Sequence, residues 1–173
     1  AGVAAGVSAV FRTPLGAVLH TGDWKLDERP VLGTPSTAEQ LKAIGDEGVL
    51  ALVCDSTNAF NADDSGSEGG VKADLLKSVK EAKGRVLLTT FASNAARLQT
   101  MGEVARETGR TLCFAGRSLH RIIDAAQANG YLKDMPKTVD MEAVDGLARH
   151  EVMVVATGGQ GEARAALARI AEG

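Results

Sequence analysis

The sequence is poor in aromatic residues, in cysteine and in charge of one sign. Phe, Trp and Tyr make up 3% of its 173 residues, so the core must consist mainly of closely packed aliphatic side chains. The net charge of −3 disfavours a diffusely basic nucleic-acid binder, although it allows a local basic pocket. Cys54 and Cys113 both lie in apolar runs, which predicts buried free thiols rather than a disulfide framework or a cysteine metal site.

Long apolar segments are also missing. No stretch reaches the length of a membrane span, and no basic segment followed by an apolar one opens the chain. These absences predict a protein of the reducing cytoplasm without a membrane partner. The chain begins at Ala1, in a run that already resembles a strand, which suggests a processed or excised piece of a longer protein.

Short strands and helices alternate along the chain. Residues 7–12 and 16–20 predict two strands joined by a turn at Thr13-Pro14. A loop over 24–38 and a helix at about 37–45 follow. Later apolar runs are nearly continuous, a pattern typical of strands buried on both faces. These predicted strands cover residues 49–54, 85–91, 111–115 and 151–156, and the predicted helices cover residues 71–83, 95–108, 118–129 and 162–172.

Helix boundaries carry recognisable capping residues. Asn94 and Ser118 are predicted N-caps, and Gly84, Gly109 and Gly130 are predicted to end the three preceding helices. The order of elements predicts an α/β fold with a mostly parallel, right-handed, three-layer sheet.

Small and hydroxylated residues follow the four predicted strands. Ligands of open parallel sheets bind beyond the carboxyl ends of the strands. Helix N-terminal N–H groups beside Ser, Asn and Gly form anion sites, and Arg117 adds a phosphate donor. Helix capping alone explains any one of these ends, but four at one edge favour a phosphate-like ligand. The four ends are Asp55–Asn58, Thr89–Asn94, Gly116–Ser118 and Thr157–Glu162, and the last three lead into predicted helices.

The lack of other known motifs disfavours several activities. The chain has no Walker A lysine motif, and TGGQGE is not a GxGxxG after the first strand, which disfavours ATP hydrolysis and ordinary dinucleotide binding. The three histidines show no HxH or HxxxH spacing, so the chain is not expected to assemble a zinc site by itself. His20 and Asp23, three apart on a strand, are predicted to face opposite sides, which makes His20 structural. Asp23 itself either starts a turn or presents a carboxylate to a metal or substrate.

Five segments in fixed order resemble the ribonuclease J family, in the β-CASP branch of the metallo-β-lactamase fold. The segments are HTGDWKLD, CDSTNA, TTFASNAARLQ, GRSL and TGGQGEARAALARIA, and the resemblance runs from about residue 10 to residue 173. It implies that residues 1–55 are the end of a metallo-β-lactamase domain and that residues 56–173 are most of a β-CASP domain.

The resemblance also implies roles for individual residues. Asp23 would bridge two metal ions, which would be Zn²⁺, with Mn²⁺ or Mg²⁺ as alternatives. Asp55 would orient a catalytic histidine supplied from elsewhere in the protein. Phosphates of RNA would be bound by residues of three loops, namely Ala92, Ser93 and Asn94, then Arg117 and Ser118, and finally Gly158, Gly159, Gln160, Gly161 and Glu162.

The activity implied by the resemblance is hydrolysis of RNA by a dinuclear-metal mechanism. The intact parent would be a cytoplasmic 5′→3′ exoribonuclease with endonuclease activity, would prefer 5′-monophosphorylated RNA, and would form homodimers or homotetramers. The chain alone is predicted to be inactive, because the family's HxHxDH and terminal histidine motifs are not in it. The alternative is a non-catalytic Rossmann-like module that binds a nucleotide or another anion, and a scaffold or interface domain is a third possibility.

Three positions depart from the family pattern. The usual TGSQGE reads TGGQGE here, so Gly159 lacks a hydroxyl, and Gly69 stands where a basic residue is usual. Both changes predict weaker phosphate binding. Trp24 replaces the usual phenylalanine, a mild change.

Overall fold

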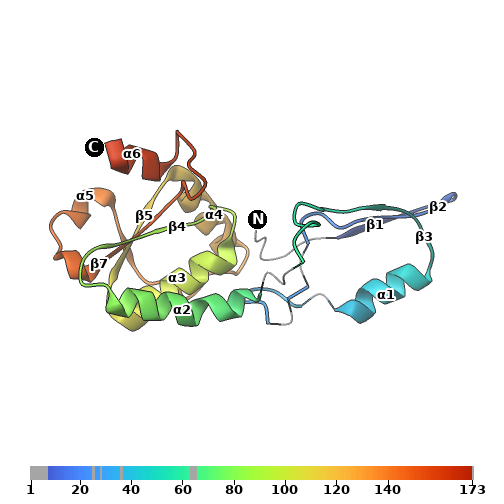
Figure 1. Cartoon of the computed structure of the whole chain (residues 1–173), viewed down its shortest axis with the longest axis horizontal. Helices are drawn as coiled ribbons and strands as arrows, with labels where there is room; N and C mark the ends of the chain where they lie inside the picture. Colours follow the sequence, from blue (N-terminus) through green and yellow to red (C-terminus); the bar gives the residue numbers. More distant parts are fainter. Residues whose placement is uncertain (1–7, 25, 28, 36, 63–65, 173) are drawn as a thin grey trace. The chain divides into compact units, whose positions relative to one another are not determined.

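The computed structural model describes residues 8–172, apart from residues 25, 28, 36 and 63–65. The chain divides into two compact units, Ala1–Gly69 and Gly70–Gly173, and each is described by itself. Figure 1 shows the helices and strands of both. Among the described residues, no helix combines the length and the apolar character needed to cross a membrane.

The first unit contains a three-stranded sheet in the order β1-β2-β3. Strand β1 (Ala9–Thr13) pairs antiparallel with β2 (Gly16–His20), and β2 pairs parallel with β3 (Val49–Val53). The parallel connection contains helix α1 (Ala38–Asp46), which starts in a reciprocal capping box between Thr37 and Gln40. The predicted hairpin and helix are therefore confirmed, although residue 7 lies outside the described residues.

The second unit is the predicted α/β domain, built on a parallel sheet in the order β4-β7-β5-β6. Its strands are β4 (Val86–Thr89), β5 (Thr111–Ala115), β6 (Thr138–Val139) and β7 (Val152–Ala156). Its helices are α2 (Glu68–Glu81, whose first two residues belong to the first unit), α3 (Ala95–Thr108), α4 (Arg117–Ala128), α5 (Met141–Val144) and α6 (Ala166–Glu172), and a 3₁₀ turn spans Arg149–Glu151.

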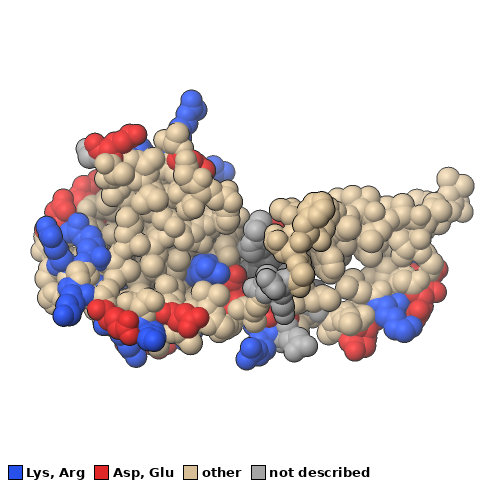
Figure 2. Space-filling model, in the orientation of Figure 1, with Lys and Arg blue, Asp and Glu red and all other residues tan. Residues whose placement is uncertain are grey.

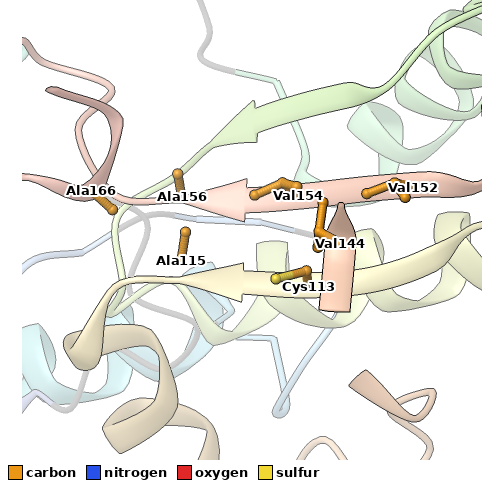
Figure 3. Close-up of a cluster of buried hydrophobic side chains, with 7 residues drawn as sticks. All are labelled: Cys113, Ala115, Val144, Val152, Val154, Ala156 and Ala166. Atoms are coloured by element: carbon orange, nitrogen blue, oxygen red, sulfur yellow. The ribbon is translucent and has the colours of Figure 1, made fainter. Parts of the chain in front are cut away.

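The sheet of the second unit is covered on both faces, as the three-layer prediction requires. Side chains of β5 and β7 alternate between the faces. Val144 of α5 and Ala166 of α6 pack on one face, against the cluster drawn in Figure 3: Cys113, Ala115, Val152, Val154 and Ala156. On the other face, where α3 and α4 contact each other and β5, the buried side chains are Leu112, Phe114, Met153 and Val155. Burial raises the pKa of the Cys113 thiol, which marks it as a packing residue rather than a nucleophile.

Arg110 connects the elements at the amino end of this sheet. Its guanidinium is buried and donates to backbone carbonyls of Ala82 at 2.6 Å, Gly84 at 2.8 Å and Val152 at 3.2 Å, and to that of Val79 at 3.4 Å. The prediction that Gly84 ends the preceding helix is wrong, because α2 stops at Glu81 and Gly84 is not left-handed. The carbonyls that follow α2 are satisfied by an arginine rather than by a glycine cap.

The other end of α2 is also held by charged groups. Lys72 Nζ lies 2.7 Å from Glu103 and 2.8 Å from Glu107, both on α3. Hydrogen bonds to these carboxylates raise the pKa of Lys72. Burial acts to raise the pKa of Glu103, but hydrogen bonds from Lys72 and Gln99 outweigh it and leave the pKa lowered. Helix α2 is thus tied to α3 near its start and to Arg110 at its end.

The predicted strand at residues 49–54 is present, but the prediction that it is buried in the parallel sheet was wrong. The strand exists as β3, but it belongs to the three-stranded sheet and not to the parallel sheet of the second unit. Leu50 and Leu52 are 67% and 58% exposed, and Cys54 is also exposed rather than buried. A short apolar run looks the same in sequence whether or not other elements cover it.

We expect Arg110→Met to lower the free energy of unfolding by about 3 to 5 kcal/mol, because it leaves several backbone carbonyls without their charged donor. Urea unfolding followed by far-UV circular dichroism measures the loss. Arg121→Met is the matched control, since Arg121 is an exposed residue of α4, and we expect it to stay within about 0.5 kcal/mol of the unsubstituted protein. Equal unfolding midpoints for the two variants would contradict the assignment.

Candidate functional site

Two loops leave the same edge of the sheet in the first unit, because β2 and β3 run parallel. Beyond the paired residues, the Thr21 N–H donates to the Val53 carbonyl at 3.0 Å. The indole Nε1 of Trp24 donates to the backbone carbonyl of Asp55 at 3.1 Å. The HTGD and CDST segments therefore lie side by side, and we call their residues 20–24 and 54–57 the acidic edge.

Asp23 lies beyond the strand rather than on it. Strand β2 ends at His20, and Gly22 has a φ of +60°, so strand alternation does not separate His20 from Asp23 as the sequence predicted. His20 Nδ1 accepts the Gly22 N–H at 3.1 Å, which gives this histidine a local role in the turn. Asp23 is exposed, and its carboxylate accepts no hydrogen bond from the described part of the chain.

Asp55 differs from Asp23 because its carboxylate is already engaged. It accepts hydrogen bonds from the hydroxyl of Thr57 and, at 3.0 Å, from the backbone N–H of Thr57. These bonds lower the pKa of Asp55, so the group stays ionised at neutral pH. An ionised carboxylate held in one orientation is suited to accept a hydrogen bond from an imidazole.

The described residues of the acidic edge supply single metal ligands and not a complete metal site. Within the described ranges, no group of three or more His, Cys, Asp and Glu side chains comes together in a metal-binding arrangement. Asp23 nevertheless fits the role of one ligand, since it is an exposed carboxylate without a competing hydrogen bond among the described residues.

Three predicted loops converge in the second unit, at the carboxyl end of the parallel sheet. Strand β7 lies between β4 and β5, so the loops that follow these three strands are neighbours. The Thr90 N–H donates to the Ala156 carbonyl at 3.1 Å, and the Thr157 N–H donates to the Ala115 carbonyl at 3.4 Å. We call residues 89–94, 116–118 and 157–162 the loop edge. The fourth predicted end, Asp55–Asn58, belongs to the first unit, so the prediction of four ends on one sheet was wrong.

The loop after β7 is held mainly by its own residues. Helix α6 begins at Ala166, not at residue 162. Thr157 accepts the first two N–H groups of this helix. Its hydroxyl accepts the Ala166 N–H at 3.3 Å, and its carbonyl accepts the Leu167 N–H at 2.9 Å. The prediction that this loop leads straight into a helix with free N–H groups was therefore wrong. Glu162 accepts the Gln160 N–H at 2.9 Å, which folds the loop back on itself.

Gly158 lies where only glycine fits this loop. Its φ is +122°, and a Cβ there would lie 2.8 Å from the Cβ of Leu167 and 2.9 Å from that of Ala165. Gly161 also has a positive φ, of +80°. The path of the loop thus depends on glycines at two of the predicted phosphate-binding positions.

The helices after β4 and β5 start in different ways. Asn94 is buried, and its side chain caps α3 by accepting the Arg97 N–H at 2.9 Å, as predicted. Ala92 is half-buried beside it, and Ser93 is exposed. The N-cap of α4 is Gly116, which offers no side-chain oxygen, so the prediction that Ser118 caps this helix was wrong.

The start of α4 is the most open of the three helix starts on the loop edge. Arg117 and Ser118 are its first two residues, and both are exposed. Their backbone N–H groups bind no described residue. A helix N-terminus with free N–H groups and an adjacent guanidinium attracts anions.

Charge around this helix start is mixed. Figure 2 shows basic and acidic side chains interspersed mainly toward the rim of the second unit, on the face in view. A hollow of about 410 Å³ opens beside Gly116 and is lined by basic and acidic groups together. These groups are Arg117, His120, Arg169, Asp140 and Glu142. The loop edge therefore offers local phosphate donors rather than a broad basic surface.

Sequence reasoning missed two residues that hold these loops. Trp24 was noted only as a substitution, yet its indole joins the two segments of the acidic edge. Thr157 opens the TGGQGE segment and binds the start of α6. No spacing in the sequence signals either contact, because the Trp24 contact depends on how distant strands pair and the Thr157 contacts depend on the path of the loop that follows β7.

A family model and three relatives described here connect this chain to ribonuclease J. Residues 83–173 match the family model described as "Ribonuclease J, beta-CASP domain". The chain is 44% identical over 165 residues to ribonuclease J of Sinorhizobium meliloti, covering 95% of this chain and 29% of that protein. It is 45% identical over 162 residues to ribonuclease J of Corynebacterium glutamicum, covering 93% of this chain and 23% of the relative.

A third relative is ribonuclease J of Thermus thermophilus, 39% identical over 162 residues. This match covers 94% of the chain and 28% of that protein. The chain thus spans between 23% and 29% of the length of these three relatives.

We expect Gly158→Ala to destabilise the protein by about 2 kcal/mol or more, because the new methyl group meets two Cβ atoms and the backbone is left-handed. Thermal unfolding followed by circular dichroism measures the change. Gly70→Ala is the matched control, since Gly70 lies in α2 with no atom close to the added Cβ. It is expected to be neutral or to stabilise the protein by up to about 1 kcal/mol. If both variants melted alike, the close packing of this loop would be refuted.

Proposed function

Because this chain belongs to the ribonuclease J family, we propose that it is part of an enzyme that hydrolyses RNA phosphodiester bonds. The proposed enzyme acts as a 5′→3′ exoribonuclease and also as an endoribonuclease. The observation that carries the proposal is that the three loops of the loop edge, which are rich in small and hydroxylated residues, converge at the carboxyl ends of β4, β7 and β5. RNA-binding enzymes need backbone contacts of this kind, since phosphate is present at every nucleotide.

The proposed domains are a metallo-β-lactamase portion over residues 1–55 and a β-CASP portion over residues 56–173. Support comes from the family match over residues 83–173 and from the two separate sheets. The boundary between the two compact units lies further along the chain than the proposed domain boundary, after Gly69. Residues of the connection bind back to Asp27: the Ser67 hydroxyl donates to it at 2.6 Å and the Glu68 N–H donates at 3.0 Å.

At the acidic edge, Asp23 is proposed to bridge two divalent cations, Zn²⁺ in the first instance and Mn²⁺ or Mg²⁺ as alternatives. Divalent ions in such sites supply an activated water and neutralise charge that develops at phosphorus. Asp55 is proposed to orient a histidine from another part of the protein. Its exposure and its lowered pKa support this role, because an ionised carboxylate fixes the tautomer and direction of an imidazole.

At the loop edge, the proposed RNA-binding residues fall into two groups: those that offer exposed hydrogen-bond donors and those that shape the loops. The Ser93 hydroxyl, the Arg117 guanidinium and the N–H groups of Arg117 and Ser118 are exposed donors. The other proposed positions shape the loops around the phosphates, and they are Ala92, Asn94, Gly158, Gly159, Gln160, Gly161 and Glu162. Contacts to phosphate predict binding with weak sequence preference and strong salt dependence.

The proposed partners are RNA with a 5′-monophosphate end and further copies of the same protein, as a homodimer or homotetramer. The proposed location is the cytoplasm.

At Gly69, where the family resemblance leads one to expect a basic residue, an added Cβ would lie 3.1 Å from the Arg29 carbonyl. A side chain there requires a local shift, which supports the proposal that this position contributes no phosphate contact.

In the full-length protein that carries this sequence, we expect Asp23→Asn to reduce metal-dependent RNA cleavage by at least about 100-fold, because a neutral amide is a poor bridging ligand. Asp55→Asn is expected to cost about 10- to 100-fold, the usual effect of losing a residue that orients a ligand. Cleavage of 5′-monophosphorylated and 5′-hydroxyl RNA is compared with Zn²⁺ or Mn²⁺ supplied. Asp46→Asn, on exposed α1, is the control and is expected to keep full activity. Full activity of Asp23→Asn would overturn the proposed metal role.

The 173-residue chain by itself is expected to cleave no RNA, because Asp23 is only one of the several ligands that a dinuclear site needs. Incubation of the purified chain with labelled RNA and each metal ion tests this. Cleavage that persisted in the Asp23→Ala chain would refute it.

A further inference from the structure

Thr89 directs its hydroxyl at the glycine that departs from the family pattern. A Cβ built on Gly159 would lie 3.1 Å from the Oγ1 of Thr89 and 3.5 Å from its Cβ. Thr89 is the last residue of β4, paired with Ala156 of β7, so its position is fixed by the sheet. Gly159 is exposed and Thr89 is half-buried, which places the hydroxyl at an accessible point of the loop edge.

This hydroxyl has no hydrogen-bond partner among the described residues, whereas the hydroxyls of the neighbouring threonines each have one. The Thr90 hydroxyl donates to the Phe91 carbonyl at 3.4 Å, and the Thr157 hydroxyl accepts the Ala166 N–H at 3.3 Å. Thr89 Oγ1 makes no hydrogen bond within the described ranges. Because threonine is β-branched and sits in a paired strand, little side-chain entropy is lost when its hydroxyl binds.

The two positions compete for the same space. A serine at 159 would bring its Cβ to 3.1 Å from the Thr89 oxygen, closer than ordinary van der Waals contact. The edge therefore accommodates a hydroxyl from residue 89 or from residue 159 more readily than both. The absence of a side chain at Gly159 leaves the Thr89 hydroxyl uncovered.

We propose that Thr89 is a phosphate-binding residue of this protein, and that its hydroxyl donates to the 5′-terminal phosphate of RNA in place of the hydroxyl that residue 159 lacks. The proposal rests on the proposed function, in which the loop edge binds RNA. It differs from the expectation that glycine at 159 weakens phosphate binding, because in the proposal the donor is retained on the neighbouring strand. Thr89 thus becomes a residue that determines preference for a phosphorylated end.

The test measures binding of 5′-monophosphorylated and 5′-hydroxyl RNA oligonucleotides to the full-length protein, without added metal ion, by fluorescence anisotropy. Thr89→Val keeps the shape of the side chain and removes the donor. It is expected to weaken binding of the monophosphorylated RNA about tenfold, the effect of one hydrogen bond to a charged group. Binding of the 5′-hydroxyl RNA is expected to stay within about twofold of wild type.

Three further variants sharpen the result. Thr89→Ser keeps the hydroxyl and is expected to keep the preference. The double variant Thr89→Ala/Gly159→Ser moves the hydroxyl across the edge and is expected to recover most of the lost affinity. Thr111→Val is the matched control, because Thr111 is also a half-buried strand threonine but opens β5 at the opposite end of the sheet. Thermal unfolding of each variant confirms that it is folded.

The outcomes separate the two proposals. If wild type prefers the monophosphorylated RNA and Thr89→Val keeps that preference, the role of Thr89 is refuted and the proposed function stands. An equal loss for both RNAs in Thr89→Val also refutes it. If wild type binds both RNAs equally, the loop edge does not recognise a terminal phosphate, and that part of the proposed function falls together with the inference.

Discussion

The buried guanidinium of Arg110 is the interaction on which the second unit depends. It follows the left-handed Gly109 that ends α3, and it directly precedes β5. From this position it binds carbonyls at the end of α2, before β4 and at the start of β7. One side chain thus gathers the amino ends of the three strands whose carboxyl ends carry the loop edge. Strands of four or five residues extend about 13 to 17 Å and are stiff, so fixing one end largely determines where the other end lies.

At the loop edge, most polar groups are used to hold the loops, and few remain for a ligand. Asn94 caps α3, Thr157 binds the start of α6, and Glu162 binds the backbone within its own loop. Their hydrogen bonds satisfy groups that would otherwise be unpaired near the sheet. The donors that hold no loop in this way are concentrated at the start of α4, at exposed Ser93 and at the hydroxyl of Thr89. The proposed phosphate site would therefore be selective through its geometry, since most polar atoms of the loop edge set the positions of a few donors.

The sequence predicts several local features of this fold correctly, although not the N-cap of α4, and it predicts long-range features poorly. The cap at Asn94 and the end of α3 at Gly109 each depend on residues within one helical turn. Each local signal is sufficient because its partner is nearby in the chain. The assignment of β3 to the wrong sheet and the supposed cap at Gly84 fail for the opposite reason. Sheet membership and the Arg110 contacts depend on residues dozens of positions apart, and an apolar run carries no record of its partner.

The acidic edge and the loop edge arise in the same way, from the ends of neighbouring parallel strands. Each edge lies where neighbouring parallel strands end, so their loops meet without any sequence relationship between them. At the acidic edge, the family resemblance leads one to expect phenylalanine at position 24. The indole N–H of Trp24 binds the Asp55 carbonyl, a bond that a phenyl ring cannot make. That bond joins the segment carrying Asp23 to the segment carrying Asp55. A substitution that looks mild in sequence thus adds a direct link between the two acidic segments, because the strands had already placed their ends within hydrogen-bonding distance.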